Sequence, residues 1–132
     1  KELNALFTGD TLFSLGCGRI FEGTYDQMFS SLDKLKKFPK NTKIYCGHEY
    51  TKKNSDFCLH IDPENPNLIN KINDINLNIK NNKPTIPSIL KDELECNIFL
   101  RTDNLEIQKQ LGINSGDPIK TFAKLRDLKD NF

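Results

Sequence analysis

Two residues of the types that bind divalent metals follow two short apolar segments of this chain. Asp10 comes directly after segment 4–8 and His48 soon after segment 42–46, and both segments have the pattern of short, largely buried strands. In layered α/β proteins the residues just past strand ends point into a shared cleft, so we expect the two side chains to converge. A carboxylate and an imidazole suit zinc or a similar ion. On position alone, a turn-capping aspartate and a structural histidine are the commoner roles.

Basic residues occur at two further places where a ligand could bind. Arg19 ends the sequence Gly-Cys-Gly-Arg, whose small residues let a ligand approach the backbone. Arg126 and Lys129 are three apart on a helix that we expect over 118–129, so they lie on one face and could together hold a carboxylate. Basic residues near the end of a helix also interact favourably with its dipole, so a solvated basic face is the commoner explanation for this pair.

Composition limits the classes of function. The 132 residues suffice for one ordinary domain or two small ones, and 19 Lys and Arg against 18 Asp and Glu leave a net charge of +1. This balance excludes a global basic field for nucleic acid or anionic lipid. The sequence has no membrane-length apolar run and no segment that resembles the apolar region of a signal peptide, and its four cysteines lack C-x-x-C spacing. We therefore expect reduced thiols and a cytoplasmic location.

The elements that position these residues change in type near Tyr50. Before it, the pattern predicts a strand over 4–8, a glycine-rich loop over 11–23, a helix that begins with a capping box of Thr24 and Gln27, and a strand over 42–46. After it, we expect helices alone, over 51–60, 66–80 and 118–129, with shorter helices capped by Ser88 and by Asp103 with Glu106. The segment after Tyr50 is thus expected to be all-α.

Several longer motifs follow one another in a fixed order. They are FTGDTLF at 7–13, GCGR at 16–19, EGT at 22–24, YCGHEYT at 45–51, PTIPS at 84–88, NIFLR at 97–101, and Arg126 with KDNF at 129–132. In this order they resemble the C-terminal half of glyoxalase II (hydroxyacylglutathione hydrolase), a member of the metallo-β-lactamase superfamily. The resemblance covers essentially the whole chain, and the ordered set is far more specific than any single motif.

This resemblance implies a thioesterase that hydrolyses S-D-lactoylglutathione to D-lactate and glutathione at a site with two divalent metals, which are zinc, iron or manganese. It implies that Asp10 bridges the two metals and that His48 is a ligand of the second metal. The residues that it implies for holding the glutathione moiety are Arg19, Tyr50, Arg126 and Lys129.

The chain lacks the H-x-H-x-D-H motif on which the family's metal site depends. Since each zinc takes about three or four protein ligands, Asp10 and His48 cannot complete two sites, and hydrolysis by this chain alone is not expected. The chain begins at Lys1, inside what looks like a strand, so we expect a truncated product and a partner that supplies the N-terminal half.

We expect two domains. Residues 1–50 would be the C-terminal portion of a metallo-β-lactamase-like αββα sandwich, and residues 51–132 a helical hydroxyacylglutathione hydrolase C-terminal domain. The first would expose a sheet edge and apolar faces, so we expect the isolated chain to self-associate as a homodimer.

Two other functions remain open at this stage. One is a glutathione persulfide dioxygenase-like enzyme, which uses iron and shares Gly-Cys-Gly-Arg. The other is a non-enzymatic module that binds glutathione or a partner. The segments 46–50 and 129–132 favour the hydrolase over the dioxygenase.

Overall fold

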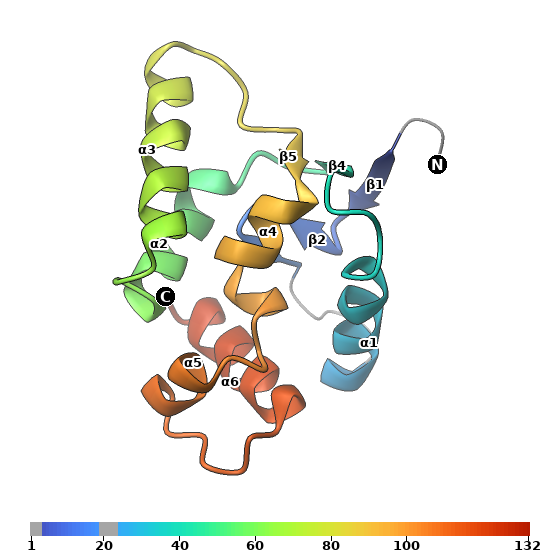
Figure 1. Ribbon diagram of the computed structural model, residues 1–132, viewed down its shortest axis with the longest axis vertical. Helices are drawn as coiled ribbons and strands as arrows, with labels where there is room; N and C mark the ends of the chain where they lie inside the picture. The colour runs from blue at the N-terminus through green and yellow to red at the C-terminus, as the bar shows by residue number, and fades with distance from the viewer. Residues whose placement is uncertain (1–3, 19–23) are drawn as a thin grey trace.

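The chain folds as helices arranged around a small sheet (Figure 1). The computed structural model describes residues 4–18 and 24–132. Within these two ranges no helix has the length and apolar character needed to cross a membrane. The expected mixed α/β class is confirmed.

The three-stranded sheet joins segments that are far apart in the sequence. Strand β1 (Ala5–Gly9) pairs in parallel with β4 (Lys43–Cys46), and β4 pairs antiparallel with β5 (Ser88–Ile89). The two strands expected from the pattern are therefore present, within one residue at each end. Because β1 and β4 run in parallel, the turns that follow them emerge at the same edge of the sheet.

The glycine-rich loop contains a short hairpin that the sequence pattern did not reveal. Strands β2 (Leu12–Phe13) and β3 (Gly16–Cys17) pair antiparallel, and all four of their residues are buried. Leu15, between the strands, has a φ of +60° and is fully buried. Strand β3 lies against the helix over Thr51–Ile61 and the 3₁₀ turn over Ile98–Leu100.

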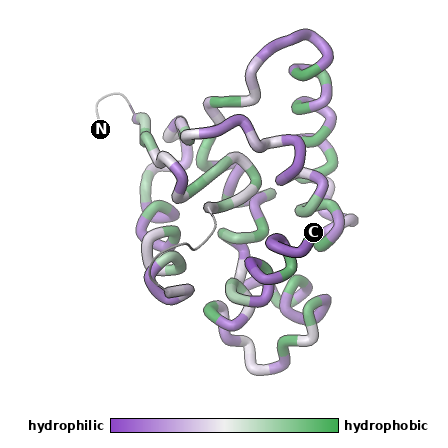
Figure 2. Tube along the Cα trace, turned by 180° about the vertical axis from the view of Figure 1, so that it is seen from behind, coloured by the Kyte–Doolittle hydropathy of each residue, from purple (hydrophilic) through white to green (hydrophobic). Residues whose placement is uncertain are grey.

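Helices form most of the remaining structure. They are α1 (Tyr25–Leu35), α2 (Thr51–Ile61), α3 (Pro66–Lys80), α4 (Leu90–Cys96), the 3₁₀ turn η1 (Ile98–Leu100), α5 (Leu105–Gln110) and α6 (Pro118–Asp130). The capping box of Thr24 and Gln27 is confirmed, as is Asp117 as the N-cap before Pro118. Hydrophobic and hydrophilic residues alternate along α3 (Figure 2), as expected for a helix with one buried face.

Two details of the segment after Tyr50 correct the sequence analysis. This segment is not all-α, because Ser88 and Ile89 form β5 beside β4. Ser88 is consequently a strand residue and does not cap the following helix, whose N-cap is Ile89 without a side-chain bond. The cap of α5 is Asn104, whose Oδ1 accepts from the Ile107 N–H, and not Asp103. A two-residue strand has no periodicity of its own and forms only because its partner strand is present.

Buried polar side chains connect the hairpin to the helices that follow. Glu93 of α4 is fully buried and accepts a hydrogen bond of 2.8 Å from the Leu15 N–H and one of 3.3 Å from the Ser14 hydroxyl. Asn97 donates to the carbonyl of Gly16 at 3.1 Å and to Glu93 at 3.0 Å. The N-terminal fifty residues and the helical segment thus share one continuous core.

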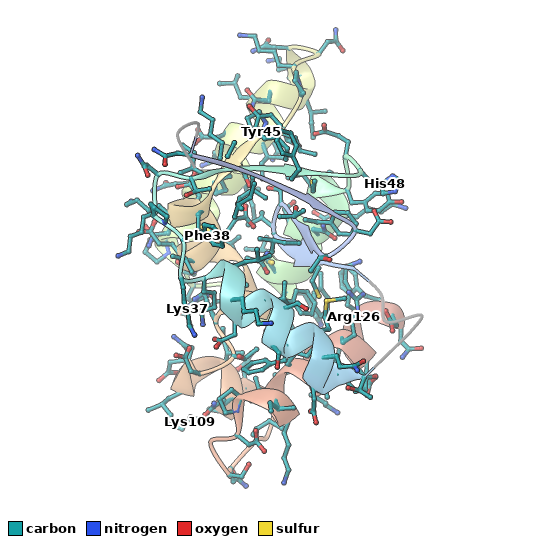
Figure 3. All side chains as sticks on the ribbon, turned by 90° about the vertical axis from the view of Figure 1, so that its right-hand side faces the viewer. Lys37, Phe38, Tyr45, His48, Lys109 and Arg126 are labelled. Carbon is teal, nitrogen blue, oxygen red and sulfur yellow. The ribbon has the colours of Figure 1, made fainter. Side chains whose placement is uncertain are left out.

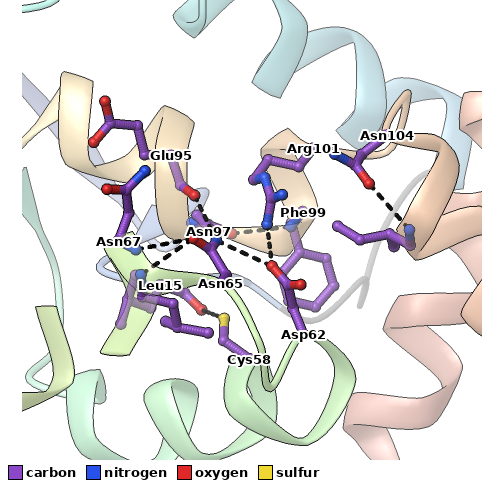
Figure 4. A network of polar contacts seen from close by, with 12 residues as sticks. Leu15, Cys58, Asp62, Asn65, Asn67, Glu95, Asn97, Phe99, Arg101 and Asn104 are labelled. Atoms are coloured by element: carbon purple, nitrogen blue, oxygen red, sulfur yellow. Dashed lines mark hydrogen bonds and ion pairs between the residues drawn. The ribbon is translucent and has the colours of Figure 1, made fainter. Parts of the chain in front are cut away.

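A second polar network holds the start of α3 (Figure 4). The Asn65 carboxamide caps α3 through its oxygen, while its nitrogen donates to Asp62 at 3.0 Å and to the Glu95 carbonyl at 2.9 Å. Asp62 also forms an ion pair with Arg101. These bonds fix the end of α2 and the start of α3 against α4.

Candidate functional site

One pocket collects almost all the residues singled out from the sequence. It has a volume of about 450 Å³ and lies between the hairpin, the turn after β4, the start of α2 and the end of α6. Its lining residues are Asp10, Phe13, Cys17, Gly18, His48, Tyr50, Lys53, Asn54, Arg126 and Lys129. Five of the six expected site residues are in this set, and the sixth, Arg19, lies outside the described residues.

The parallel pairing of β1 and β4 brings Asp10 and His48 together. Gly9 pairs with Cys46, and the Gly47 N–H donates to the Gly9 carbonyl at 2.7 Å. His48 Nε2 lies 3.3 Å from Asp10 Oδ1, and the two side chains are 50% and 73% exposed. The expected convergence of the two strand ends is therefore present. Both side chains remain open to a ligand from outside the chain.

Two glycines make this close approach sterically feasible. A Cβ on Gly18 would lie 1.8 Å from the Asp10 carbonyl oxygen, which no side chain could tolerate. A Cβ on Gly47 would lie 2.9 Å from Asp10 Oδ1. The glycines thus permit tight packing of backbone around Asp10.

Aromatic contacts hold the His48 ring. The imidazole stacks on Tyr50, with ring centroids 4.9 Å apart and planes 9° from parallel. Phe13 meets the Tyr50 ring edge-on at 5.1 Å. Offset or edge-on aromatic pairs of this kind favour one ring orientation. The histidine is therefore positioned by ring contacts in addition to its contact with Asp10.

On another side of the pocket, Arg126 is built into the structure. Its side chain is only 3% exposed, and Nη1 donates to the carbonyls of Cys17 at 2.7 Å and Gly18 at 3.2 Å. Nε and Nη2 contact Asp130 Oδ1 at 3.1 and 2.8 Å. The guanidinium also lies 5.3 Å from the centre of the Phe99 ring. Arg126 therefore connects α6 to strand β3. His48 and Arg126 lie on the same side of the molecule (Figure 3).

Cys17 lines the pocket without being poised to act as a nucleophile. Burial raises the pKa of its thiol to about 11, although the nearby Arg126 guanidinium opposes this rise. Because the thiolate is the reactive form, a thiol with this pKa is essentially inert at neutral pH. The pocket therefore offers a cysteine as a wall residue only.

Lys53, Asn54 and Phe13 also line the pocket, although none of them was expected as a site residue. The spacing of Tyr50, Lys53 and Asn54 contains a usable signal, since residues at i, i+3 and i+4 share one face at the start of α2. Asn54 donates to the Ser14 carbonyl at 3.1 Å and so fixes the hairpin against α2. Phe13 gave no such signal, because its role depends on the fold of the hairpin.

Asp10 and His48 fit a divalent metal as part of a ligand set. Their carboxylate oxygen and imidazole nitrogen are donors that zinc, iron and manganese accept, and both are exposed and adjacent. Over 4–18 and 24–132, no group of three histidine, cysteine or acidic side chains is arranged to bind a metal. Further ligands must therefore come from outside these residues if a metal binds here.

Comparison with known proteins identifies the family of the chain. Helices packed on a small sheet make this an α/β protein. Its pocket contains basic side chains and, at Asp10 and His48, a carboxylate beside an imidazole, so it is a candidate site for a ligand and for part of a metal centre. The family model described as "Hydroxyacylglutathione hydrolase C-terminus" matches residues 49–132, and the chain belongs to this family. The resemblance found in the sequence is thereby confirmed.

Curated relatives extend the similarity to the whole chain. A hydroxyacylglutathione hydrolase from Pelagibacter ubique is 58% identical over 128 residues, which are 97% of this chain and 48% of the relative. Proteins of the same name from Rhodospirillum rubrum and Nostoc punctiforme are 46% and 47% identical, over 99% and 100% of this chain and 51% of each relative. The chain spans about half the length of the curated relatives it matches.

Proposed function

We propose that the chain forms the glutathione-binding part of a thioesterase that hydrolyses S-D-lactoylglutathione to D-lactate and glutathione. The observation that carries the proposal is the single pocket that joins Asp10 and His48 to Tyr50, Arg126 and Lys129. The names of the relatives specify a hydroxyacylglutathione as substrate and favour hydrolysis over the dioxygenase alternative.

In this proposal the two sides of the pocket have different tasks. Asp10 and His48 would hold part of a centre of two divalent metals, zinc, iron or manganese, which would supply water activation and polarisation of the thioester carbonyl. Tyr50 would contact the glutathione moiety, and its ring also stacks on His48 and favours one orientation of the imidazole. Arg126 shapes the pocket through Cys17 and Gly18, and Lys129 supplies a cation for a carboxylate of glutathione. Arg19 would add a second cation.

The proposal needs a partner that provides the remaining metal ligands, namely the N-terminal half that the curated relatives contain. Strand β1 is at an edge of the three-stranded sheet, and its residue Phe7 is 80% exposed. We assign this edge to the partner half, with residues 1–50 completing an αββα sandwich and residues 51–132 forming the helical domain. In the absence of the partner, the same edge is expected to drive homodimer formation. Light scattering that shows a monomer at all concentrations would contradict this dimer.

A cytoplasmic location belongs to the proposal. All four cysteines are free thiols, and three of them, Cys17, Cys58 and Cys96, are buried. Such thiols are typical of a reducing compartment.

Complementation tests the function directly. The chain is mixed with the N-terminal half of the Pelagibacter ubique relative and zinc, and loss of the thioester absorbance of S-D-lactoylglutathione is followed. We expect hydrolysis in the mixture and none with either half alone. Light scattering establishes that the halves associate. A folded, associated mixture without hydrolysis would falsify the proposal, and oxygen uptake with glutathione persulfide and iron would support the dioxygenase instead.

A further inference from the structure

The described lining of the pocket carries more positive than negative charge. Three cationic side chains, Lys53, Arg126 and Lys129, accompany one carboxylate, that of Asp10, which already contacts His48. The glutathionyl group carries two carboxylates, one on its glycine and one on its γ-glutamyl residue. A pocket with several cations therefore suits this ligand, and the question is which cation contacts a carboxylate.

Arg126 has little capacity left for such a contact. A guanidinium has five N–H groups, and four of them already donate to Cys17, Gly18 and Asp130. Among the described residues, acceptors occupy every N–H of Arg126 except one on Nη2, which is left for a ligand. The bidentate grip that makes arginine a strong carboxylate binder would require Arg126 to give up bonds that hold β3 to α6.

Lys53 differs from Arg126 in both its exposure to solvent and its lack of ion pairs with the described residues. It is exposed in the first turn of α2 and lines the pocket. Among the ion pairs of the described residues, none involves Lys53, whereas its neighbour Lys52 is bound to Asp56 at 3.0 Å and does not line the pocket. The ammonium group of Lys53 can therefore reach a ligand without breaking a bond within the described protein.

The stability of α2 does not account for a lysine at this position. The N-terminal end of a helix carries partial positive charge, so acidic side chains stabilise the first turn and basic ones oppose it. The first turn of α2 has no acidic residue, and no side chain caps it at Tyr50. Lys53 and the helix end thus present positive potential together, on the wall of the pocket where Tyr50 also lies.

We propose that Lys53 is a binding residue for a carboxylate of the glutathionyl group, which it holds together with Lys129. The inference rests on the proposed function, which supplies the identity of the ligand. Lys53 would be a determinant of ligand specificity in addition to Arg126 and Lys129. Arg126 shapes the wall of the pocket through its bonds to Cys17 and Gly18 and can add one N–H to the same carboxylate.

Calorimetric titration of the 132-residue chain with S-methylglutathione, which cannot be hydrolysed, tests the inference. We expect Lys53→Gln to weaken binding about fivefold to tenfold, the range for one charge-assisted contact at a partly exposed site. Lys52→Gln, the matched control on the same turn, should change binding less than about twofold. Two further ligands identify the carboxylate: S-methylglutathione with its glycine carboxylate amidated, and S-methylcysteinylglycine, which lacks the γ-glutamyl carboxylate. The ligand that lacks the carboxylate contacted by Lys53 should bind to the wild type and to Lys53→Gln with equal affinity.

The outcomes separate the two proposals. Binding by the wild type that Lys53→Gln leaves unchanged contradicts the role of Lys53 and leaves the proposed function standing. Weakening that is the same for all three ligands, or the same for Lys52→Gln, also contradicts a carboxylate contact by Lys53. A wild type that binds none of the three ligands contradicts the glutathione pocket itself, and with it the proposed function.

Discussion

On one side of the pocket the side chains of Asp10 and His48 are 73% and 50% exposed, whereas on another side the side chain of Arg126 is only 3% exposed. Asp10 and His48 contact each other, and the His48 ring stacks on Tyr50. Arg126 instead donates to the backbone carbonyls of Cys17, in strand β3, and of Gly18, directly after it, which are 109 and 108 residues away. All three residues carry the family resemblance, yet they depend on the fold to very different degrees.

This difference separates residues that are costly to replace from residues that are free to bind. Removing a buried charged donor leaves its acceptors unsatisfied and lowers stability. Removing an exposed side chain with few bonds changes stability little. Substitution of Asp10 or His48 should therefore lower activity without lowering stability. Substitution of Arg126 should lower the free energy of unfolding.

The largest expected effect is on the exposed side. In the complemented mixture, Asp10→Asn should reduce thioester hydrolysis about 1,000-fold, because metal polarisation is worth several kcal/mol in such reactions. The free energy of unfolding of the isolated variant, measured by urea denaturation, should stay within about 0.5 kcal/mol of the wild type. A variant that unfolds as readily as an Arg126 variant would remove the distinction between the two sides.

On the buried side, Arg126→Met should lower the free energy of unfolding by about 3 kcal/mol, since it removes charged hydrogen bonds to the carbonyls of Cys17 and Gly18. Lys124→Met, an exposed position on the same helix, is the control and should change stability by less than about 0.5 kcal/mol. Urea denaturation at neutral pH measures both. Equal stability of the two variants would show that Arg126 is not a structural tie.

Glu93 extends the comparison to pH. Burial raises the pKa of Glu93 above its ordinary value of 4.5, although bonds from the Leu15 N–H and Asn97 oppose the rise. The folded state therefore keeps the Glu93 proton to higher pH than the unfolded chain does. The contribution of Glu93 to the free energy of unfolding is therefore complete below the ordinary pKa and is lost as pH rises from there through the raised pKa of the folded state.

Glu93→Gln should remove this decline. The amide can still accept from the Leu15 N–H, so we expect a loss of about 1 kcal/mol at low pH and a smaller loss, or a gain, at high pH. Urea denaturation from about pH 5 to pH 8 follows the change. Glu95→Gln, at a partly exposed carboxylate paired with Lys91, serves as the control and should keep the slope of the wild type. An unchanged slope in Glu93→Gln would contradict the raised pKa.

Local pattern predicted the exposed side of the pocket better than the buried one. The ends of β1 and β4 and the first turn of α2 follow from short-range periodicity, so the convergence of Asp10 and His48 and the start of α2 at Thr51 were accessible. The structural role of Arg126 was not accessible, because its acceptors are backbone atoms of a two-residue strand distant in sequence. Strand β5 was missed for the same reason.

The smallest expected effect concerns the ring contacts of the exposed side. Tyr50 stacks on His48 and meets Phe13 edge-on, and the residue is 47% exposed. Tyr50→Leu should cost about 0.5 kcal/mol in the free energy of unfolding, whereas Tyr50→Phe keeps both ring contacts and should cost less. The imidazole proton resonances of His48, recorded by NMR, give a sharper measure, because stacking on an aromatic ring shifts them upfield. The shift should persist in Tyr50→Phe and disappear in Tyr50→Leu. Loss of the shift in both variants would mean that the tyrosine hydroxyl, and not the ring, positions His48, and the exposed side would then depend on polar bonds as the buried side does.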